Sequence, residues 1–251
     1  MSGGVADSVN KAAHILNRQN QARANWISGV SHDIRTPLSM IMGYSKRIAD
    51  EDSLNVDVRK KAEIINQQSI RIRELVQDLN LVSQLEYEMQ PIHKATIRIA
   101  SLVRTYVADL LNGGLPDQYS IDIEISANAE ITTFECDARL ISRAINNLVQ
   151  NSIQHNPDGC AIMLSLDHRE DQVFLCVADN GIGLSAKKLT ELWERPHYIE
   201  STDNRLDLRH GLGHILVQQI VKAHNGTMQV ESEAQKGFKV TLIFPTTTNA
   251  K

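Results

Sequence analysis

The sequence predicts a multidomain chain in which an all-helical hairpin, residues 5–90, precedes an α+β domain, residues 91–246, with a short tail at 247–251. The first part contains one proline, Pro37, and is rich in the helix formers Ala, Gln, Arg, Glu and Leu. From Pro91 onward strand-like and helical runs alternate, which is typical of a mixed sheet packed on helices. A chain of 251 residues is long enough for both parts.

The hairpin part reads as two long helices joined by the polar, turn-like residues 50–53. The first helix has apolar side chains at steps of three and four, as an amphipathic helix does: Trp26, Val30, Ile34, Leu38 and Ile41. The second carries a heptad seam with further apolar residues between its repeats: Val58, Ile65, Ile72 and Leu79, then Leu75 and Val82. Two antiparallel helices enclose little core, so we expect a homodimer that forms a four-helix bundle. Packing of the hairpin against the rest of the chain is the alternative.

Strands and helices are also predicted for the second part. The expected strands are residues 119–125, 131–136, 160–167, 172–178, 227–232 and 238–244. One helix begins after Asp137, a residue suited to capping, and runs toward His155; a second spans residues 213–224. Residues 184–210 are polar and irregular, and a segment of that length in a compact domain is more often a functional lid than a plain connector.

Composition narrows the range of functions. The chain is 42% hydrophobic and 22% charged with a net charge of −4, which gives no reason to expect nucleic acid or an anionic membrane as partner. No apolar run approaches the roughly 18 residues that a membrane helix needs, and residues 1–4 lack the features of a signal peptide. The three cysteines are widely spaced, so we expect buried, reduced thiols in strands rather than a disulfide or metal site: Cys136, Cys160 and Cys176.

The octapeptide SHDIRTPL, residues 31–38, is the most informative stretch of the chain. In a helix His32 and Thr36 share one face, because they are four residues apart. The carboxylate of Asp33 can hold the Nδ1–H of His32 and leave Nε2 as a nucleophile. Pro37 should kink the helix, because it lacks a backbone donor and crowds the preceding turn. The alternative is a surface helix with an isolated histidine.

Three patches in the second part also point to chemistry. Asn147 and Asn151 lie four apart on one helical face, and an amide oxygen suits a Mg²⁺ that already holds phosphate oxygens and water. Asp179 ends a strand and is followed by Gly181 and Gly183, which let the backbone approach a ligand closely. Residues 211–213, Gly-Leu-Gly, lead into a helix whose free N–H groups favour phosphate. Solvent-facing amides and ordinary tight turns are the alternatives for each patch taken alone.

Taken together, the octapeptide resembles the H box of the sensor histidine kinases, and the three later patches resemble the N, G1 and G2 boxes of the GHKL ATPases. Residues 147–151 match the N box, residues 179–183 the G1 box and residues 211–213 the core of the G2 box. The resemblance covers about residues 12–244. It implies a dimeric helical hairpin followed by a GHKL, or Bergerat, α/β sandwich that binds ATP and Mg²⁺.

The resemblance also implies roles for individual residues. His32 would be the phosphoacceptor, Asp33 its orienting acid or base, and Thr36 a residue that helps to position water for dephosphorylating the partner. Asn151 would ligate Mg²⁺, and Asp179 would read adenine. The set expected to contact ATP is Asn147, Asn151, Gln154, His155, Asp179, Gly181, Gly183, His210, Gly211, Leu212 and Gly213.

Several positions depart from the family pattern. Arg209 stands in place of the first glycine of the G2 box, and His214 stands in place of a leucine. Gln154 and His155 stand where many relatives carry Lys-Tyr or Lys-Phe, so Gln154 lacks a charge for phosphate. In the lid, Pro196 stands near the second aromatic position of the family. These changes bear on the catalytic rate and on the function of the lid.

We therefore expect an ATP-dependent protein-histidine kinase that phosphorylates His32, passes the phosphoryl group to an aspartate on the receiver domain of a response regulator, and also dephosphorylates that regulator. The main alternative is a degenerate, catalytically weak homologue that acts as a dimeric scaffold for docking the regulator. Another kind of GHKL ATPase, such as a chaperone or topoisomerase, leaves the octapeptide unexplained. We expect this segment to be cytoplasmic, without nucleic-acid or membrane contacts of its own, and a membrane-anchored parent protein is compatible with the resemblance.

Overall fold

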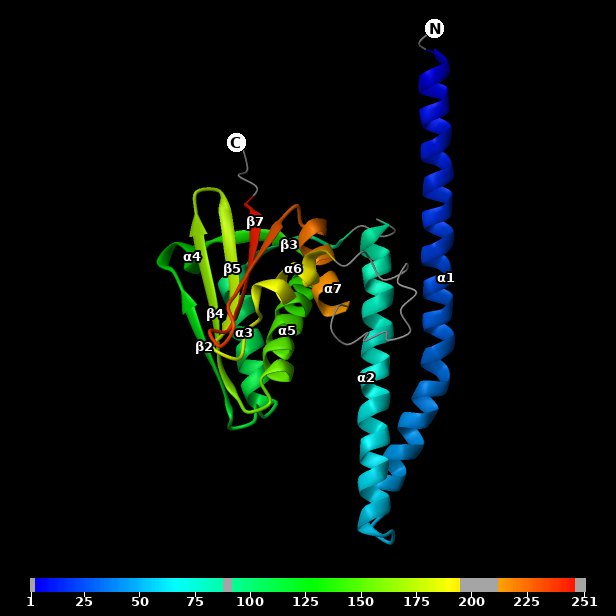
Figure 1. The fold of residues 1–251 in the computed structure, drawn as a ribbon, viewed down its shortest axis with the longest axis vertical. Coiled ribbons are helices and arrows are strands. Elements are labelled where there is room, and N and C mark those ends of the chain that lie inside the picture. Colours follow the sequence, from blue (N-terminus) through cyan, green and yellow to red (C-terminus); the bar gives the residue numbers. More distant parts are fainter. Residues whose placement is uncertain (1–2, 88–91, 195–211, 247–251) are drawn as a thin grey trace. The chain divides into compact units, whose positions relative to one another are not determined.

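The computed structural model describes residues 3–87, 92–194 and 212–246. The chain divides into two compact units, Met1–Pro91 and Ile92–Lys251, and each is described by itself. Figure 1 shows the elements of both units.

The first unit is a hairpin of two helices, α1 (Gly3–Ala49) and α2 (Val56–Glu86), so the two predicted helices are confirmed. Asn55 begins α2, because its side chain accepts a hydrogen bond from the backbone N–H of Asp57 at 2.8 Å. The α-helix continues through Pro37, and the ribbon of α1 bends in its C-terminal part, as expected for a helix with an internal proline (Figure 1).

The two helices of the hairpin pack through small side chains. On α2, Ala62, Ser69 and Ser83 are buried, and they fall on one heptad-spaced row that faces α1. Small residues let two helix backbones approach closely. The predicted apolar seam lies beside this row, and within one copy of the chain it is only partly covered. Val82 is buried and Leu75 half-buried, whereas the other four members are exposed: Val58, Ile65, Ile72 and Leu79.

The second unit contains a five-stranded sheet in the order β2-β4-β5-β7-β6. Its strands are β2 (Tyr119–Ile125), β4 (Cys160–Arg169), β5 (Gln172–Asp179), β6 (Thr227–Ser232) and β7 (Phe238–Pro245). The β2–β4 pair is parallel and the other pairs are antiparallel, so the predicted mixed sheet is confirmed. A separate antiparallel pair joins β1 (Ala95–Arg98) to β3 (Thr133–Cys136).

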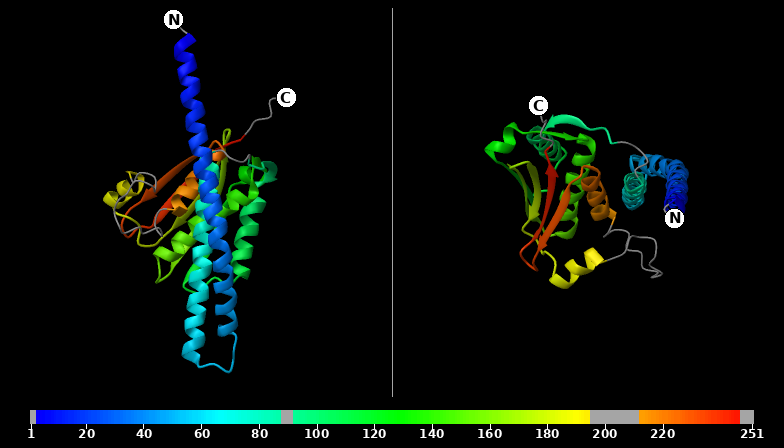
Figure 2. Two further views of the ribbon diagram at one scale, coloured as in Figure 1. Left: turned by 90° about the vertical axis from the view of Figure 1, so that its right-hand side faces the viewer. Right: turned by 90° about the horizontal axis from the view of Figure 1, so that it is seen from above.

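Three helices cover one face of the large sheet and build the core with it: α3 (Ile99–Asn112), α5 (Ala138–His155) and α7 (Leu212–Ala223). Figure 2 shows this two-layer arrangement, with helices gathered on one side of the strands. Alternate residues of β4 and β5 point into the core, where Leu164 and Leu175 meet the apolar faces of α5 and α7. Fully buried side chains on these helices include Ile141, Ile145, Leu216 and Ile220.

Burial of the cysteines agrees with the prediction of reduced thiols in strands. All three are free: Cys136 and Cys160 are buried, and Cys176 is half-buried. Burial raises the pKa of Cys136 to about 12, so its thiol stays protonated and unreactive at neutral pH.

The structure corrects two parts of the element prediction. Residues 131–136 were expected to form one strand, but Ala127–Ile131 is the short helix α4, capped by the hydroxyl of Ser126, and the strand begins at Thr133. The segment 184–210 was expected to be irregular, but it contains the helix α6 (Ala186–Glu194). Both helices are short, so a hydrophobic period has little length in which to show.

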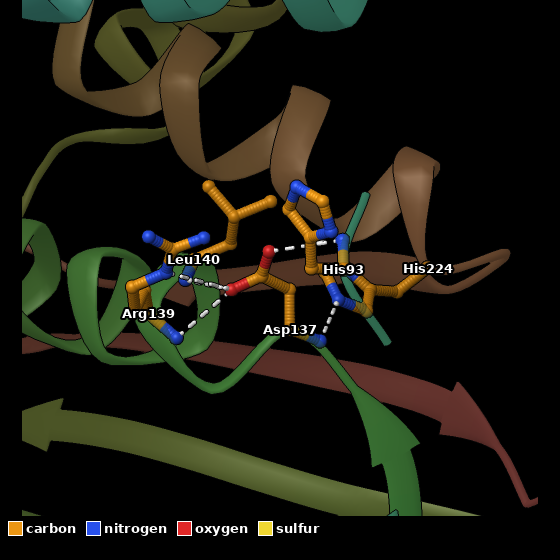
Figure 3. Close-up of polar contacts among 5 residues, drawn as sticks. All are labelled: His93, Asp137, Arg139, Leu140 and His224. Atoms are coloured by element: carbon orange, nitrogen blue, oxygen red, sulfur yellow. Dashed lines mark hydrogen bonds and ion pairs between the residues drawn. The ribbon is translucent and has the colours of Figure 1, made fainter. Parts of the chain in front are cut away.

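The start of α5 is fixed by a buried polar cluster (Figure 3). The carboxylate of Asp137 caps the helix by accepting from the backbone N–H groups of Arg139 and Leu140, and also accepts from that of His93. The N–H of Asp137 donates to Nε2 of His224 at 3.0 Å, while Nδ1 of His224 bonds the carbonyl of Ile220 at 2.7 Å. His224 is therefore neutral with its hydrogen on Nδ1, and burial lowers its pKa.

Candidate functional site

His32 lies on the solvent-facing side of α1. Its side chain is 75% exposed, and Nδ1 lies 3.4 Å from Oδ1 of Asp33, whose side chain is 85% exposed. Thr36, four residues later, is also exposed on the same helical face. The 3.4 Å distance is long for a strong hydrogen bond, so Asp33 is placed to orient the ring without holding it firmly. The imidazole is accessible to a reacting partner.

A second group of predicted residues meets in the second unit, where α5 passes the start of α7. Asn147 and Asn151 lie half-buried on one face of α5. Gly213 lies against both: a Cβ at this glycine would be 2.7 Å from Oδ1 of Asn147 and 3.7 Å from Nδ2 of Asn151. A side chain at position 213 would therefore push the amide of Asn147 aside, while the distance to Asn151 is an ordinary van der Waals contact.

Asp179 lies at the end of β5, close to the same helix. Its Oδ2 accepts a hydrogen bond from the hydroxyl of Ser152 at 2.7 Å, and its Oδ1 accepts one from the backbone N–H of Gly181 at 3.0 Å. Ser152 directly follows Asn151 on α5. The carboxylate and the asparagine pair are therefore brought to one region by a single turn of helix.

The loop after Asp179 is held from two sides. On one side, Oδ1 of Asn156 accepts the backbone N–H of Ile182 at 2.8 Å, and a Cβ at Gly181 would overlap this amide. On the other side, the loop packs on the turn between β6 and β7: Gly183 has φ +57° and leaves no room for a Cβ beside the carbonyl of Glu233. The two glycines thus serve a close approach and a positive φ, as the sequence predicted.

The remaining predicted site residues differ in their burial, and some lie outside the described part of the chain. Gln154 and His155 lie exposed in the last turn of α5. Leu212 is buried and begins α7, so the helix N-terminus lies at the predicted glycine-rich patch. His210 and Gly211 lie outside the residues that the structure describes. Burial lowers the pKa of His214, which favours its neutral form.

Sequence reasoning did not single out Ser152 and Asn156. Both side chains are buried, and both touch the carboxylate of Asp179. Ser152 lies on the buried, mostly apolar face of α5, and Asn156 directly follows the helix as its C-cap. A polar residue at a position expected to be buried was the available signal. Their partner is 27 and 23 residues away in sequence, respectively, so only the folded chain shows the contact.

The site supplies neutral oxygen ligands rather than a cage for a metal ion. Among the described residues, no group of three or more His, Cys, Asp or Glu side chains could hold a metal. A Mg²⁺ that keeps phosphate oxygens and water needs only one or two protein oxygens. The amide oxygen of Asn151 fits that requirement. None of the described helices is long and apolar enough to cross a membrane.

Two family models match the chain. Residues 22–88 match the His Kinase A (phospho-acceptor) domain, and residues 136–248 match the histidine kinase-, DNA gyrase B-, and HSP90-like ATPase domain. The first match contains His32, and the second contains the asparagine pair, Asp179 and Gly213. The histidine and the predicted nucleotide-site residues therefore fall in two different family domains.

Curated relatives are sensor proteins. The chain is 28% identical to the sensor histidine kinase YvrG of Bacillus subtilis, covering 96% of the chain and 43% of that protein. It is 27% identical to the phosphate regulon sensor protein PhoR of Haemophilus influenzae, covering 96% and 55%, and 26% identical to the signal transduction kinase BaeS of Escherichia coli, covering 97% and 51%. The chain spans about half the length of the curated relatives it matches.

Solved structures share the fold. The full-length ShkA structure in complex with AMPPNP aligns with a TM-score of 0.69 at 20% identity, covering 90% of this chain and 47% of that one. The histidine kinase AdeS of Acinetobacter baumannii aligns with a TM-score of 0.60 at 18% identity, covering 86% and 98%. The predicted order of a helical hairpin and a GHKL-type sandwich is confirmed by these likenesses.

Proposed function

The chain belongs to the sensor histidine kinases of two-component systems, and from this premise we propose that it transfers the γ-phosphoryl group of ATP to His32 and then to an aspartate of a response regulator. One observation carries the proposal. The chain combines an exposed histidine beside a carboxylate in one unit with a site of paired asparagines, glycines and Asp179 in the other.

The second unit has groups suited to each part of Mg²⁺–ATP. The carboxylate of Asp179 can accept an N–H from the exocyclic amine of adenine. The N–H groups at the start of α7 favour the phosphates. Asn151 would hold the metal ion, which when bound neutralises charge on the phosphate oxygens. The ShkA structure is a complex with AMPPNP, an ATP analogue, which supports ATP as the nucleotide here.

His32 would act as the nucleophile through Nε2. With Asp33 near Nδ1, the neutral ring carries its hydrogen on Nδ1, and the lone pair of Nε2 attacks the γ-phosphorus in line. A P–N bond forms, the bond to the β-phosphate oxygen breaks and ADP leaves. The exposure of the ring admits first the nucleotide and then the carboxylate of the regulator.

The hairpin, residues 5–90, would also be the dimerisation domain, and residues 91–246 the catalytic domain. Apolar residues remain exposed on both helices of the hairpin, beside the row that pairs α1 with α2. On α1 they are Val30, Ile34, Ile41, Tyr44 and Ile48, and on α2 they are Val58, Ile65, Ile72 and Leu79. A second copy would cover both stripes in a four-helix bundle.

The weak-scaffold alternative rests on the altered G2 box, Arg209 and His214. The contacts of Gly181, Gly183 and Gly213 favour a working site, because each glycine admits a close approach that packs the loops of the site together: Asn156 at Gly181, Glu233 at Gly183 and Asn147 at Gly213. Nucleotide titration with and without Mg²⁺ distinguishes a working kinase from a weak scaffold. A kinase should bind ATP with an affinity that Mg²⁺ changes and should pass label to an isolated receiver domain. A scaffold should bind the receiver domain and leave it unlabelled.

A further inference from the structure

The carboxylate of Asp179 is held by three donors that the chain itself provides. Ser152 Oγ donates to Oδ2 at 2.7 Å, Gly181 N–H donates to Oδ1 at 3.0 Å, and Nδ2 of Asn156 approaches Oδ1 at 3.4 Å. Ser152 and Asn156 are only 6% and 5% exposed. Water cannot readily replace either donor, so each has a larger effect than a surface hydrogen bond.

Asn156 ties the carboxylate to the loop that follows it. Its Nδ2 also donates to the carbonyl of Ser152 at 2.7 Å, and its Oδ1 accepts the N–H of Ile182 at 2.8 Å. The amide therefore has both of its ends bonded and a fixed orientation. Gly181 has no side chain where this amide lies, because a Cβ there would overlap it.

The number of donors limits what the carboxylate can still bind. An ionised carboxylate offers about four acceptor directions, and the three described donors occupy three of them. The remaining acceptor direction can take an N–H of the base. It offers no hydrogen to a carbonyl oxygen placed at the same point.

We propose that Ser152 and Asn156 are positioning residues that make the nucleotide site select a purine with an exocyclic amine over a purine with a carbonyl at that position. The inference rests on the proposed ATP-dependent function and adds the side chains that set the choice of base. Without these donors the carboxylate of Asp179 could rotate away from the base, and the site would discriminate less between the two bases.

The first test compares affinities of the 251-residue chain for ATP and for inosine triphosphate, which carries a carbonyl in place of the amine, by calorimetry at pH 7.5. Wild type should prefer ATP. In Ser152→Ala the ratio of the two affinities should fall roughly tenfold, the effect of one hydrogen bond to a charged group. Ser165→Ala is the matched control, because it removes a hydroxyl from β4 and none of the three donor bonds involves it.

The second test varies the pH. A residue with a merely structural role would give no pH-dependent change in nucleotide affinity. Ser152→Ala removes a donor and adds no ionisable group, so its ratio of ATP affinity to inosine triphosphate affinity should stay low at every pH tested. Asn156→Asp places a second carboxylate beside the first, so ATP binding should be weak at pH 8. It should recover toward pH 6, where a shared proton turns the new acid into a donor.

The outcomes separate the inference from the function on which it rests. Wild type that fails to bind ATP would sink the proposed function. Wild type that binds ATP and inosine triphosphate equally, or variants that keep the wild-type ratio at every pH, would overturn only this inference. Thermal unfolding of each variant checks the fold, and if Ser152→Ala does not fold, Asn156→Asp decides alone through its recovery of ATP binding toward pH 6.

Discussion

At the scale of single residues, the proposed function gives His32 and Thr36 separate tasks although they share one face of α1. His32 would carry the phosphoryl group, and the exposed hydroxyl of Thr36, one turn away, would orient a water molecule. Neither side chain is buried, so replacing one should leave the hairpin folded and change chemistry alone.

Thr36→Ala should separate the two activities. We expect autophosphorylation near the wild-type rate, because the imidazole and Asp33 are unchanged, and at least a tenfold slower loss of phosphate from the regulator. The measurement is the decay of a labelled, purified regulator with either protein. Dephosphorylation by Thr36→Ala at the wild-type rate would contradict a role of Thr36 in the phosphatase reaction.

Gly181→Ala should weaken nucleotide binding strongly. The new Cβ would overlap the amide of Asn156, so either the loop or the amide must move, and Asp179 loses its donors. We expect at least a tenfold loss of ATP affinity by calorimetry. Gly43→Ala is the control, because nothing lies within 4 Å of a Cβ there, and it should bind ATP as wild type does.

The residues with a recognisable pattern were predictable from sequence, and their supports were not. The paired asparagines and the two glycines after Asp179 follow from spacing and backbone freedom. Ser152 and Asn156 act only after β5 has been placed beside α5, and no local pattern encodes that contact. Side chains that position a site through tertiary contacts cannot be identified from the spacing of residues along the chain.

At the scale of elements, α5 is the central support of the second unit. Its N-terminus is held by the cluster of Asp137 and His224, its middle presents the asparagine pair, and its last turn holds Asp179 and the loop after it. A change at the first end can therefore reach the site through one rigid helix.

The neutral state of His224 predicts a dependence of stability on pH. Burial lowers its pKa in the folded state, while Lys94 and Asp137 act on it in opposite directions. The stabilisation is present above the unfolded pKa of about 6.5 and is lost as the pH falls, because the unfolded chain then binds the proton more readily. The free energy of unfolding should fall by up to about 1.4 kcal/mol per pH unit below that value.

His224→Gln tests this origin, because the amide oxygen can accept the N–H of Asp137 and does not titrate. Chemical unfolding at pH 7.5 and pH 5.5 should show a smaller loss of stability for this variant than for wild type. Equal losses in both proteins would assign the acid sensitivity to other groups.

Elements were predictable where alternation or a capping residue marked them. The strands β2 and β6 agree with their predicted bounds, and α5 begins at its predicted cap, Asp137. The helix α3 was not predicted, although Val103 and Val107 give it an apolar stripe, because its N-cap, Arg98, makes no side-chain cap. The strand β1 has four residues, too few for alternation to be distinctive.

At the scale of the whole molecule, the exposed apolar stripes of the hairpin are the basis of the dimer that we propose. The heptad seam was visible in the sequence, but only the structure shows that the partner helix covers a neighbouring row of small residues instead. The exposed residues of the seam are therefore available to contact another chain.

Ile72→Lys should break the dimer. Ile72 lies in the middle of the seam and is 46% exposed in one copy, and a buried, unpaired ammonium in the bundle is costly. Light scattering coupled to size exclusion should give the monomer mass, 28.0 kDa, instead of twice that value. Gln67→Lys is the control: five residues earlier on the helix it faces about 140° away, and it should remain dimeric.

The most direct test of the proposed kinase activity is the transfer of label from [γ-³²P]ATP to the chain in the presence of Mg²⁺, with wild type and His32→Gln in parallel. Wild type should take up label in a form that acid releases and base does not, as expected for a phosphorylated imidazole. His32→Gln should take up none while binding ATP as wild type does. Label on His32→Gln at the wild-type level would contradict the assignment of His32 as the phosphoacceptor.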